Sequence, residues 1–214
     1  MREAKSENIM VSVQKLGKKV FTTHELIAIS GKSASNVVQS LGRLEKQGLI
    51  SKIYRGVWGE ARARELSIFE IIPYLFPRQR VYVSFITALH LHGIIEQIPQ
   101  VVTLASTVHT RTIKTKIGVF SVHQITPTFF DGFDWYKSKG NFLIAEPEKA
   151  LVDSLYLSGR KKKQFGHFPE MHIPSTFSYK KAIQWAKRIR EKKIRIYVLE
   201  RLGAILKVNT KTAK

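Results

Sequence analysis

The chain has 214 residues, of which 43% are hydrophobic and none is cysteine, and its formal net charge is +20 at pH 7. Without cysteine it forms no disulfide, and a zinc site would have to be built from histidine and carboxylate ligands alone. Since no apolar run approaches the roughly 18 residues that span a bilayer, and the first ten residues hold two acids and no apolar signal core, we expect a cytoplasmic, nucleoid-associated protein without a membrane partner.

Two short helices are predicted at the N-terminus. The periodicity of the apolar residues indicates a helix over about 6–16, which ends at Gly17. A second helix over about 24–30 follows Thr22 and Thr23, because threonine is a good N-cap residue. Five apolar positions of these helices are expected to face a core: Ile9, Val13, Leu16, Leu26 and Ile29.

A third helix is predicted over about 34–47, with Ser33 or Ser35 as its N-cap. Its apolar stripe is formed by Ala34, Val37, Val38, Leu41 and Leu44. The side chains off this stripe are short and hydrogen-bonding, or basic: Ser35, Asn36, Gln39, Ser40, Arg43 and Lys46. They suit base edges and phosphates, whereas a solvated surface helix more often carries pairs of Glu and Lys. We therefore interpret this segment as a DNA-recognition helix.

A tight hairpin is predicted next, with strands at 49–54 and 57–59 on either side of Arg55 and Gly56. Its core candidates are Leu49, Ile50, Ile53, Tyr54 and Trp58. Helix, turn, amphipathic helix and hairpin in this order are typical of a winged helix-turn-helix. That module places one helix in a groove of duplex DNA.

Double-stranded operator DNA is therefore the expected partner of this region. Asn36, Gln39 and Arg43 are expected to read bases. Further DNA contacts, mainly to phosphates, are expected from Lys32, Ser33, Ser35, Ser40, Lys52 and Arg55. Taken singly, the two cations of the hairpin are explained equally well as solvated side chains.

A second domain is predicted after a charged connector at 60–66, so we expect domains at 1–66 and 67–214. The patterns predict strands at 80–83, 101–106, 112–125 (a hairpin) and 141–145. They predict helices at 67–77, at 85–94 after a Ser84 cap, and at 146–159. The predicted fold class is therefore α+β, with an N-terminal winged helix-turn-helix followed by a mixed α/β domain.

Most of the excess positive charge lies in the last quarter of the chain. Residues 160–214 hold 16 Lys and Arg against 3 Asp and Glu. We predict a basic loop, a helix at 178–190, and a strand or helix at 194–206, with helix favoured for its second half. The charge favours a second nucleic-acid contact, to DNA or RNA, over screened surface cations. The expected residues are Arg160, Lys161, Lys162, Lys163, Lys187, Arg188, Arg190, Lys192, Lys193 and Arg195.

Three segments of the second domain carry a family resemblance. They are YVSFITALHLHGII (82–95), VVTLAS (101–106) and IAEPEKALVDSLYLSG (144–159). In this order, after a winged helix, they resemble the AbiEi-type (abortive infection) antitoxins of bacterial type IV toxin–antitoxin systems. Thr87 and Glu146 depart from the family pattern, which otherwise covers about residues 20–205.

The resemblance implies a transcriptional repressor that autoregulates its operon by binding inverted repeats, with a second domain that acts as an antitoxin. It also implies a cognate nucleotidyltransferase-like toxin as a functional partner, with no stable complex required. An alternative is an orphan winged-helix regulator whose second domain senses a ligand or partner.

The segment PEKALVDSLYL has a structural and a functional interpretation. In the structural one, which we favour, Pro147 sets the start of a helix and Glu148 complements its N-terminal dipole. Leu151, Leu155 and Ala150 pack inward, and Asp153 lies on the polar side. In the functional one, antitoxin activity depends on three charged residues: Glu148, Lys149 and Asp153.

No catalytic pattern accompanies these motifs. Glu146 and Lys149 are three residues apart, which does not match the acid-x-Lys strand of metal-dependent nucleases. Gly42, Gly48 and Gly56 are not followed by the GK[ST] sequence of a Walker loop. His90 and His92 are two apart, so on a helix they diverge and do not share a metal. We expect no enzymatic activity, no metal and no cofactor.

Overall fold

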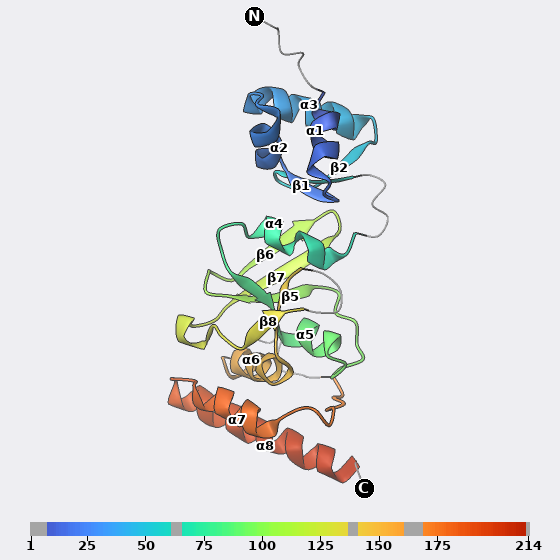
Figure 1. Cartoon of the computed structure of the whole chain (residues 1–214). Coiled ribbons are helices and arrows are strands. Elements are labelled where there is room, and N and C mark those ends of the chain that lie inside the picture. The colour runs from blue at the N-terminus through green and yellow to red at the C-terminus, as the bar shows by residue number, and fades with distance from the viewer. Residues whose placement is uncertain (1–7, 61–65, 137–140, 161–168, 213–214) are drawn as a thin grey trace, which may run out of the picture. The chain divides into compact units, whose positions relative to one another are not determined.

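The computed structural model describes residues 8–60, 66–136, 141–160 and 169–212 (Figure 1). Within these ranges it is an α+β protein with eight α-helices and two β-sheets. The chain divides into two compact units. The first comprises 1–78 with 114–118, and the second comprises 79–113 with 119–214. None of the helices in the described part of the chain is both long and apolar enough to cross a bilayer.

Three helices open the first unit, and each begins at a polar cap. Helix α1 (Ile9–Leu16) begins after Asn8, α2 (Thr23–Ser30) after Thr22, and α3 (Ala34–Lys46) after Ser33. In each case the cap side chain accepts a hydrogen bond from a backbone N–H of the first turn, which is otherwise unpaired. Gly17 and Gly31 end α1 and α2 in the left-handed conformation. The three predicted helices are therefore present.

A three-stranded antiparallel sheet completes this unit. Its order is β1-β3-β2, formed by β1 (Val20–Thr22), β2 (Ile50–Tyr54) and β3 (Val57–Glu60). The hairpin between β2 and β3 turns at Arg55 and Gly56, as predicted, and Gly56 has the positive φ of +73° that the turn needs. Strand β1 was not predicted, because three residues are too few to show an alternating pattern.

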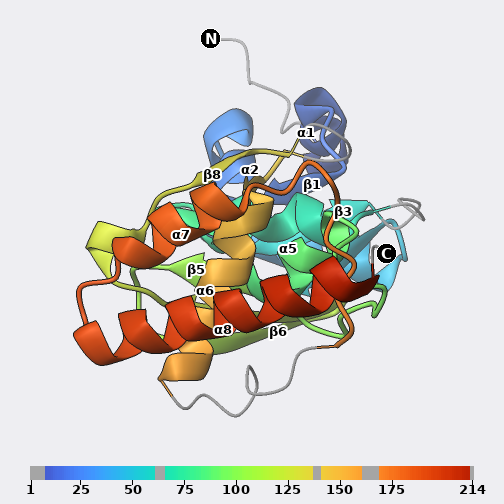
Figure 2. The ribbon, with the colours of Figure 1, turned by 90° about the horizontal axis from the view of Figure 1, so that it is seen from below.

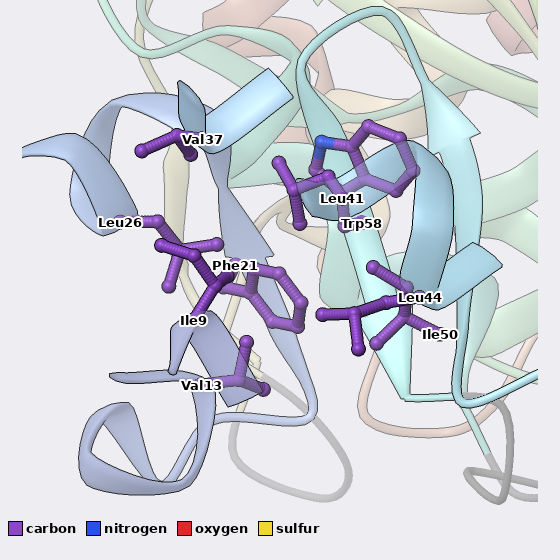
Figure 3. Packing of buried hydrophobic residues seen from close by; sticks show 9 residues of the cluster. All are labelled: Ile9, Val13, Phe21, Leu26, Val37, Leu41, Leu44, Ile50 and Trp58. Carbon is purple, nitrogen blue, oxygen red and sulfur yellow. The ribbon is translucent and has the colours of Figure 1, made fainter. Parts of the chain in front are cut away.

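The core of the first unit takes side chains from all three helices and all three strands (Figure 3). It contains Ile9, Val13, Phe21, Leu26, Val37, Leu41, Leu44, Ile50 and Trp58. Five residues predicted to lie on apolar, core-facing sides are instead exposed to solvent: Ala34, Ile29 (42%), Val38 (53%), Leu49 (45%) and Tyr54 (36%). The predicted apolar faces were too wide. On α3, Val37, Leu41 and Leu44 already fill the inward arc.

The segment after the connector is shorter and tighter than the predicted helix over 67–77. It is a 3-10 turn at Ile68–Ile71 followed by α4 (Ile72–Leu75). Ser67 caps the turn, with Glu70 in a reciprocal capping box. The contacts group residues 67–78 with the first unit, whereas the sequence placed them at the start of the second domain. Ile68 packs against Gly118, which belongs to the same unit.

The second unit is built on a six-stranded mixed sheet of order β6-β7-β5-β4-β9-β8. The strands are β4 (Val81–Val83), β5 (Val102–Ser106), β6 (Arg111–Thr115), β7 (Gly118–Gln124), β8 (Phe133–Trp135) and β9 (Leu143–Ala145). Strand β5 runs antiparallel to β4 and parallel to β7, while β9 runs parallel to β4 and antiparallel to β8. Strand β8 was not predicted.

Helices cover this sheet in two layers (Figure 2). Helices α5 (Phe85–Leu91) and α6 (Pro147–Gly159) form the inner layer, and α7 (Tyr179–Lys187) and α8 (Lys192–Thr212) cross α6 from outside. Residues 148–157 of α6 are all buried, since the helix is covered from both sides. Residues 194–206 are helical throughout, so the strand alternative for this segment was wrong.

Candidate nucleic-acid interface

Helix α3 presents two chemically different faces. Val37 and Leu41 have no exposed surface and Leu44 has 8%, so this side of the helix is part of the core. The side chains predicted to contact DNA lie away from that core. Ser33, Ser35, Asn36, Gln39 and Arg43 are exposed, and Lys32 and Ser40 are half-buried. Asn36, Gln39 and Arg43 thus lie on the exposed side of α3, and Lys32 and Ser33 lie immediately before the helix.

Ser33 already has a structural role at the start of this helix. Its hydroxyl oxygen accepts a hydrogen bond from the backbone N–H of Asn36 at 3.3 Å. The bond fixes the first turn of α3 and leaves the side chain of Asn36 exposed. A phosphate contact by Ser33 would therefore be made by a residue that also caps the helix.

The β2–β3 hairpin adds two exposed cations, Lys52 and Arg55. The ammonium of Lys52 lies 5.7 Å from the centroid of the Trp58 ring, and the ring itself is 5% exposed. Trp58 donates its indole N–H to the hydroxyl of Thr23 at 2.9 Å, which ties the hairpin to α2. Trp58 is therefore a core residue, and Lys52 extends over its ring toward solvent.

The charge of this region is strongly unbalanced. Between Lys32 and Val57 the chain carries five Lys and Arg but a single acid, Glu45. That carboxylate accepts a hydrogen bond from the backbone N–H of Lys52 at 3.2 Å, so it is held near the start of the hairpin. The outer side of α3 and the hairpin therefore combine positive charge with short hydrogen-bonding side chains, which suits a polyanion such as duplex DNA.

In the second unit, Lys149 and Asp153 form a buried ion pair on α6. Neither side chain has any exposed surface. The Lys149 ammonium contacts one carboxylate oxygen of Asp153 and lies 3.1 Å from the hydroxyl of Tyr82. The other oxygen of Asp153 accepts hydrogen bonds from Tyr82 at 2.9 Å and from Ser84 at 2.8 Å. The prediction that Asp153 lies on a polar side of the helix was wrong, because enclosed α6 has no solvent side.

Aromatic rings complete the environment of the Lys149 ammonium. The ring centroids lie at 3.9 Å for Phe129 and at 5.6 Å for both Tyr82 and Trp185. Burial lowers the pKa of Lys149 and raises the pKa of Asp153, while the contact between the two opposes both changes. Burial, together with the charge of Asp153, places the pKa of Tyr82 well above its ordinary value. These groups form a closed network, with no charged atom open to a partner.

Glu148 is not part of this network and connects α6 to α7. Its carboxylate accepts a hydrogen bond from the backbone N–H of Ser178 at 2.7 Å, at the residue that caps α7. Only 5% of Glu148 is exposed. The side chain therefore links the first turn of α6 to the first turn of α7, a contact that the sequence did not predict.

Tyr82 and Ser84 belong to the network, and sequence reasoning missed both roles. Ser84 was predicted to cap the following helix, but its side chain makes no cap hydrogen bond and donates to Asp153 instead. The sequence did contain a sign of the buried pair, because a Lys and an Asp four residues apart in a largely apolar helix lie on the same side of it. Only the packing of β4 beside α6 shows that Tyr82 and Ser84 complete the set.

The basic C-terminal residues fall into two groups. Lys187, Arg190, Lys192 and Lys193 are exposed around the α7–α8 connection. Three arginines instead contribute to the fold. Arg188 pairs with Asp131 at 3.0 Å and lies over the Trp185 ring, Arg160 pairs with Glu191, and Arg195 donates to the Ile189 carbonyl at 2.9 Å. Lys161, Lys162 and Lys163 lie outside the described residues.

One shallow cavity of about 200 Å³ lies beside α7 and is lined by Lys181, Gln184, Trp185 and Arg188. Lys181 pairs with Glu146 at 2.9 Å and Arg188 with Asp131, so both cations of the cavity already have acidic partners. The cavity therefore offers no ready anion site.

His90 and His92 contact two different backbone carbonyls. His90 contacts the backbone carbonyl of Ile95 at 3.3 Å, and His92 that of Ala145 at 2.7 Å. Throughout the described part of the chain, no three His, Asp or Glu side chains gather as metal ligands would.

No protein-family model matches the chain, and no curated protein matches it in sequence.

Proposed function

We propose that the protein is a DNA-binding transcriptional repressor and that its first unit is a winged helix-turn-helix. Helices α2 and α3 form the helix-turn-helix, α3 is the recognition helix, and the β2–β3 hairpin is the wing. The observation that carries the proposal is the division of α3, whose valine and leucines are buried while Asn36, Gln39 and Arg43 are exposed. An HTH recognition helix needs this separation, because one side anchors it and the other enters the major groove.

The exposed side chains have distinct proposed roles. Asn36 and Gln39 hydrogen-bond to base edges, and Arg43 contacts a guanine. Lys32, Ser33, Ser35, Ser40, Lys52 and Arg55 contact the DNA backbone and set the register of α3 on it. The arrangement is supported by the exposure of the hairpin cations and by the single acid between residues 32 and 57.

We further propose that the repressor is the antitoxin of a type IV toxin–antitoxin system, which autoregulates its operon by binding inverted repeats. The support is the order of the three AbiEi-like segments in the chain. The toxin would be a nucleotidyltransferase-like protein encoded next to it. The exposed Lys187, Arg190, Lys192 and Lys193 would add a second nucleic-acid contact.

Footprinting on the DNA upstream of the coding sequence tests the repressor proposal. We expect protection of an inverted repeat by the wild-type protein and a weaker footprint with Arg43→Ala. Arg78→Ala removes the same charge from an exposed position outside α3 and the hairpin, so it is the matched control. A wild-type protein that binds every duplex equally, without a protected site, would contradict sequence-specific repression.

Co-expression with the neighbouring gene tests the antitoxin proposal. Growth inhibition by that gene alone, relieved by this protein, is the expected result. If the neighbouring gene is harmless while the footprint persists, the protein is instead an orphan regulator. Incubation with plasmid and Mg²⁺ should leave the plasmid intact, and cleavage would point to a nuclease.

A further inference from the structure

Val38 departs from the sequence expectation in an informative way. The preceding residue, Val37, is fully buried, but Val38, at the border of the apolar stripe of α3, is 53% exposed. A single exposed apolar residue is ordinary on a protein surface and by itself indicates nothing. The exposure of Val38 becomes informative only together with the residue one turn further along the same helix.

That residue is Gly42, in the interior of α3. Glycine at such a position destabilises a helix by about 1 kcal/mol relative to alanine. The usual reasons for keeping it are absent here, because its φ is not positive and a Cβ built on it would meet nothing within 4 Å. By contrast, a Cβ on Gly132 or Gly59 would come within 3 Å of a neighbouring side chain. Packing within the protein therefore does not require a glycine at 42.

Val38 and Gly42 lie four residues apart, so they share one side of the helix. Gly42 lies three residues after Gln39, and Val38 three residues after Ser35, so each neighbours a residue proposed to contact DNA. The bare backbone at Gly42 and the methyl groups of Val38 thus border the hydrogen-bonding part of the helix. Glycine is the residue that permits close approach of a backbone to a ligand.

We propose that Val38 contacts the 5-methyl group of a thymine in the operator, and that Gly42 lets the backbone of α3 come close enough for this contact. The inference rests on the proposed function, because it assumes that α3 enters the major groove. Thymine is distinguished there by its methyl group, which is read by an apolar contact and not by a hydrogen bond. Val38 is the apolar side chain that α3 offers for it on its exposed side, beside Ala34.

Replacing thymine by uracil in the footprinted duplex tests the methyl contact. The substitution removes the methyl group and leaves the pairing edge unchanged. Wild-type protein should bind the uracil duplex about fourfold more weakly, the factor that corresponds to burying one methyl group. Val38→Ala should bind the thymine duplex about fourfold more weakly and should not distinguish the two duplexes. Ile29→Ala, at an exposed apolar position of α2, is the matched control and should retain the preference for thymine.

Gly42→Ala tests the close approach. The added methyl group should raise the unfolding midpoint by about 2–4 °C, the shift expected for about 1 kcal/mol in a protein of this size. It should also weaken operator binding by about tenfold. Gly203→Ala is the control, because Gly203 also lies within a helix, and its added Cβ would meet nothing within 4 Å. It should give a similar stabilisation with unchanged binding.

The outcomes separate this inference from the proposed function. Absence of any sequence-specific site for the wild-type protein would overturn both. Specific binding that is weakened by Arg43→Ala but is equal on thymine and uracil duplexes would overturn the methyl contact alone. Val38→Ala that still distinguishes the two duplexes would assign the methyl contact to another residue. A Gly42→Ala protein that is stabilised and binds normally would overturn the close approach.

Discussion

Helices α3 and α6 are both 13 residues long, but they use their polar side chains in opposite ways. Helix α3 buries three residues and exposes its polar side, where the proposed DNA-contacting residues lie. Helix α6 buries ten, including Glu148, Lys149 and Asp153, whose charged groups bond to other parts of the second unit. Polar residues on α3 are thus available to an external partner, while those on α6 belong to the fold.

The largest expected effect comes from breaking the α6 network. Asp153→Ala leaves the ammonium of Lys149 buried without its carboxylate, so we expect a loss of about 3–5 kcal/mol in the free energy of unfolding, measured by urea denaturation. The double variant Lys149→Met, Asp153→Leu removes both charges and should recover most of that stability. Equal stability of Asp153→Ala and the wild type would show that the pair is not buried in solution.

Arg43→Ala removes a charged side chain from α3, and we expect it to change DNA binding and not stability. We expect operator binding to weaken by about 1–3 kcal/mol, with relaxed preference at one base position. Because Arg43 is exposed, the free energy of unfolding should remain within about 0.5 kcal/mol of the wild type. Titration of labelled operator together with urea denaturation measures both quantities. A loss of stability without a loss of binding would place Arg43 with the structural residues.

Glu25 offers a smaller, pH-dependent test within the first unit. Burial acts to raise its pKa, but hydrogen bonds from Lys18 and Thr22 outweigh it, so the pKa of Glu25 is lowered. A carboxylate whose pKa is lower in the folded than in the unfolded state stabilises the protein at pH values above the unfolded-state pKa. This stabilisation is lost as the pH falls through the folded-state pKa. Glu25→Gln should therefore reduce stability by about 0.3–1 kcal/mol at neutral pH, with the difference from wild type vanishing in acid. Thermal unfolding at pH 7 and pH 3 measures this, and a constant difference would contradict it.

The smallest expected effect is that of Lys52→Ala in the hairpin. A phosphate contact carries no base information, so this change should weaken binding to all duplexes equally. The slope of log K against log salt should fall by about 0.9, the contribution of one phosphate contact. Salt titrations of operator and unrelated duplexes provide the measurement, with Lys15→Ala as a control outside α3 and the hairpin. An unchanged slope would leave Lys52 as a solvated cation over Trp58.

Most helices of both units could be predicted from the sequence, because their signals are local. Ser33 caps α3, Gly31 ends α2, and the spacing of Val37, Leu41 and Leu44 marks the buried side of α3. These features involve residues within about two helical turns of one another, so no knowledge of distant packing was needed. The short strands β1 and β8 escaped prediction because they are strands only through their pairing with β3 and β9.

The environment of individual residues was less predictable. Val38 and Leu49 were expected in the core and are exposed, whereas Asp153 was expected at the surface and is fully buried. An apolar residue at the border of a helical stripe is buried only if a neighbour covers that border. A charged residue is buried only if other elements bring hydrogen-bond partners to it. Strand β4 brings Tyr82 to Asp153, and Ser84, which directly follows the strand, is the second partner.

The sequence by itself determined the α+β class, the order of most elements, and the gathering of Asn36, Gln39 and Arg43 on the side of α3 opposite its buried residues. These follow from periodicities and caps that act within a few residues. Only the tertiary structure decided that α6 is enclosed between the sheet and α7 with α8, that Lys149 and Asp153 are internal, and that Val38 is exposed beside Gly42. The reason is physical: burial depends on what packs against a residue, and those neighbours come from distant parts of the chain.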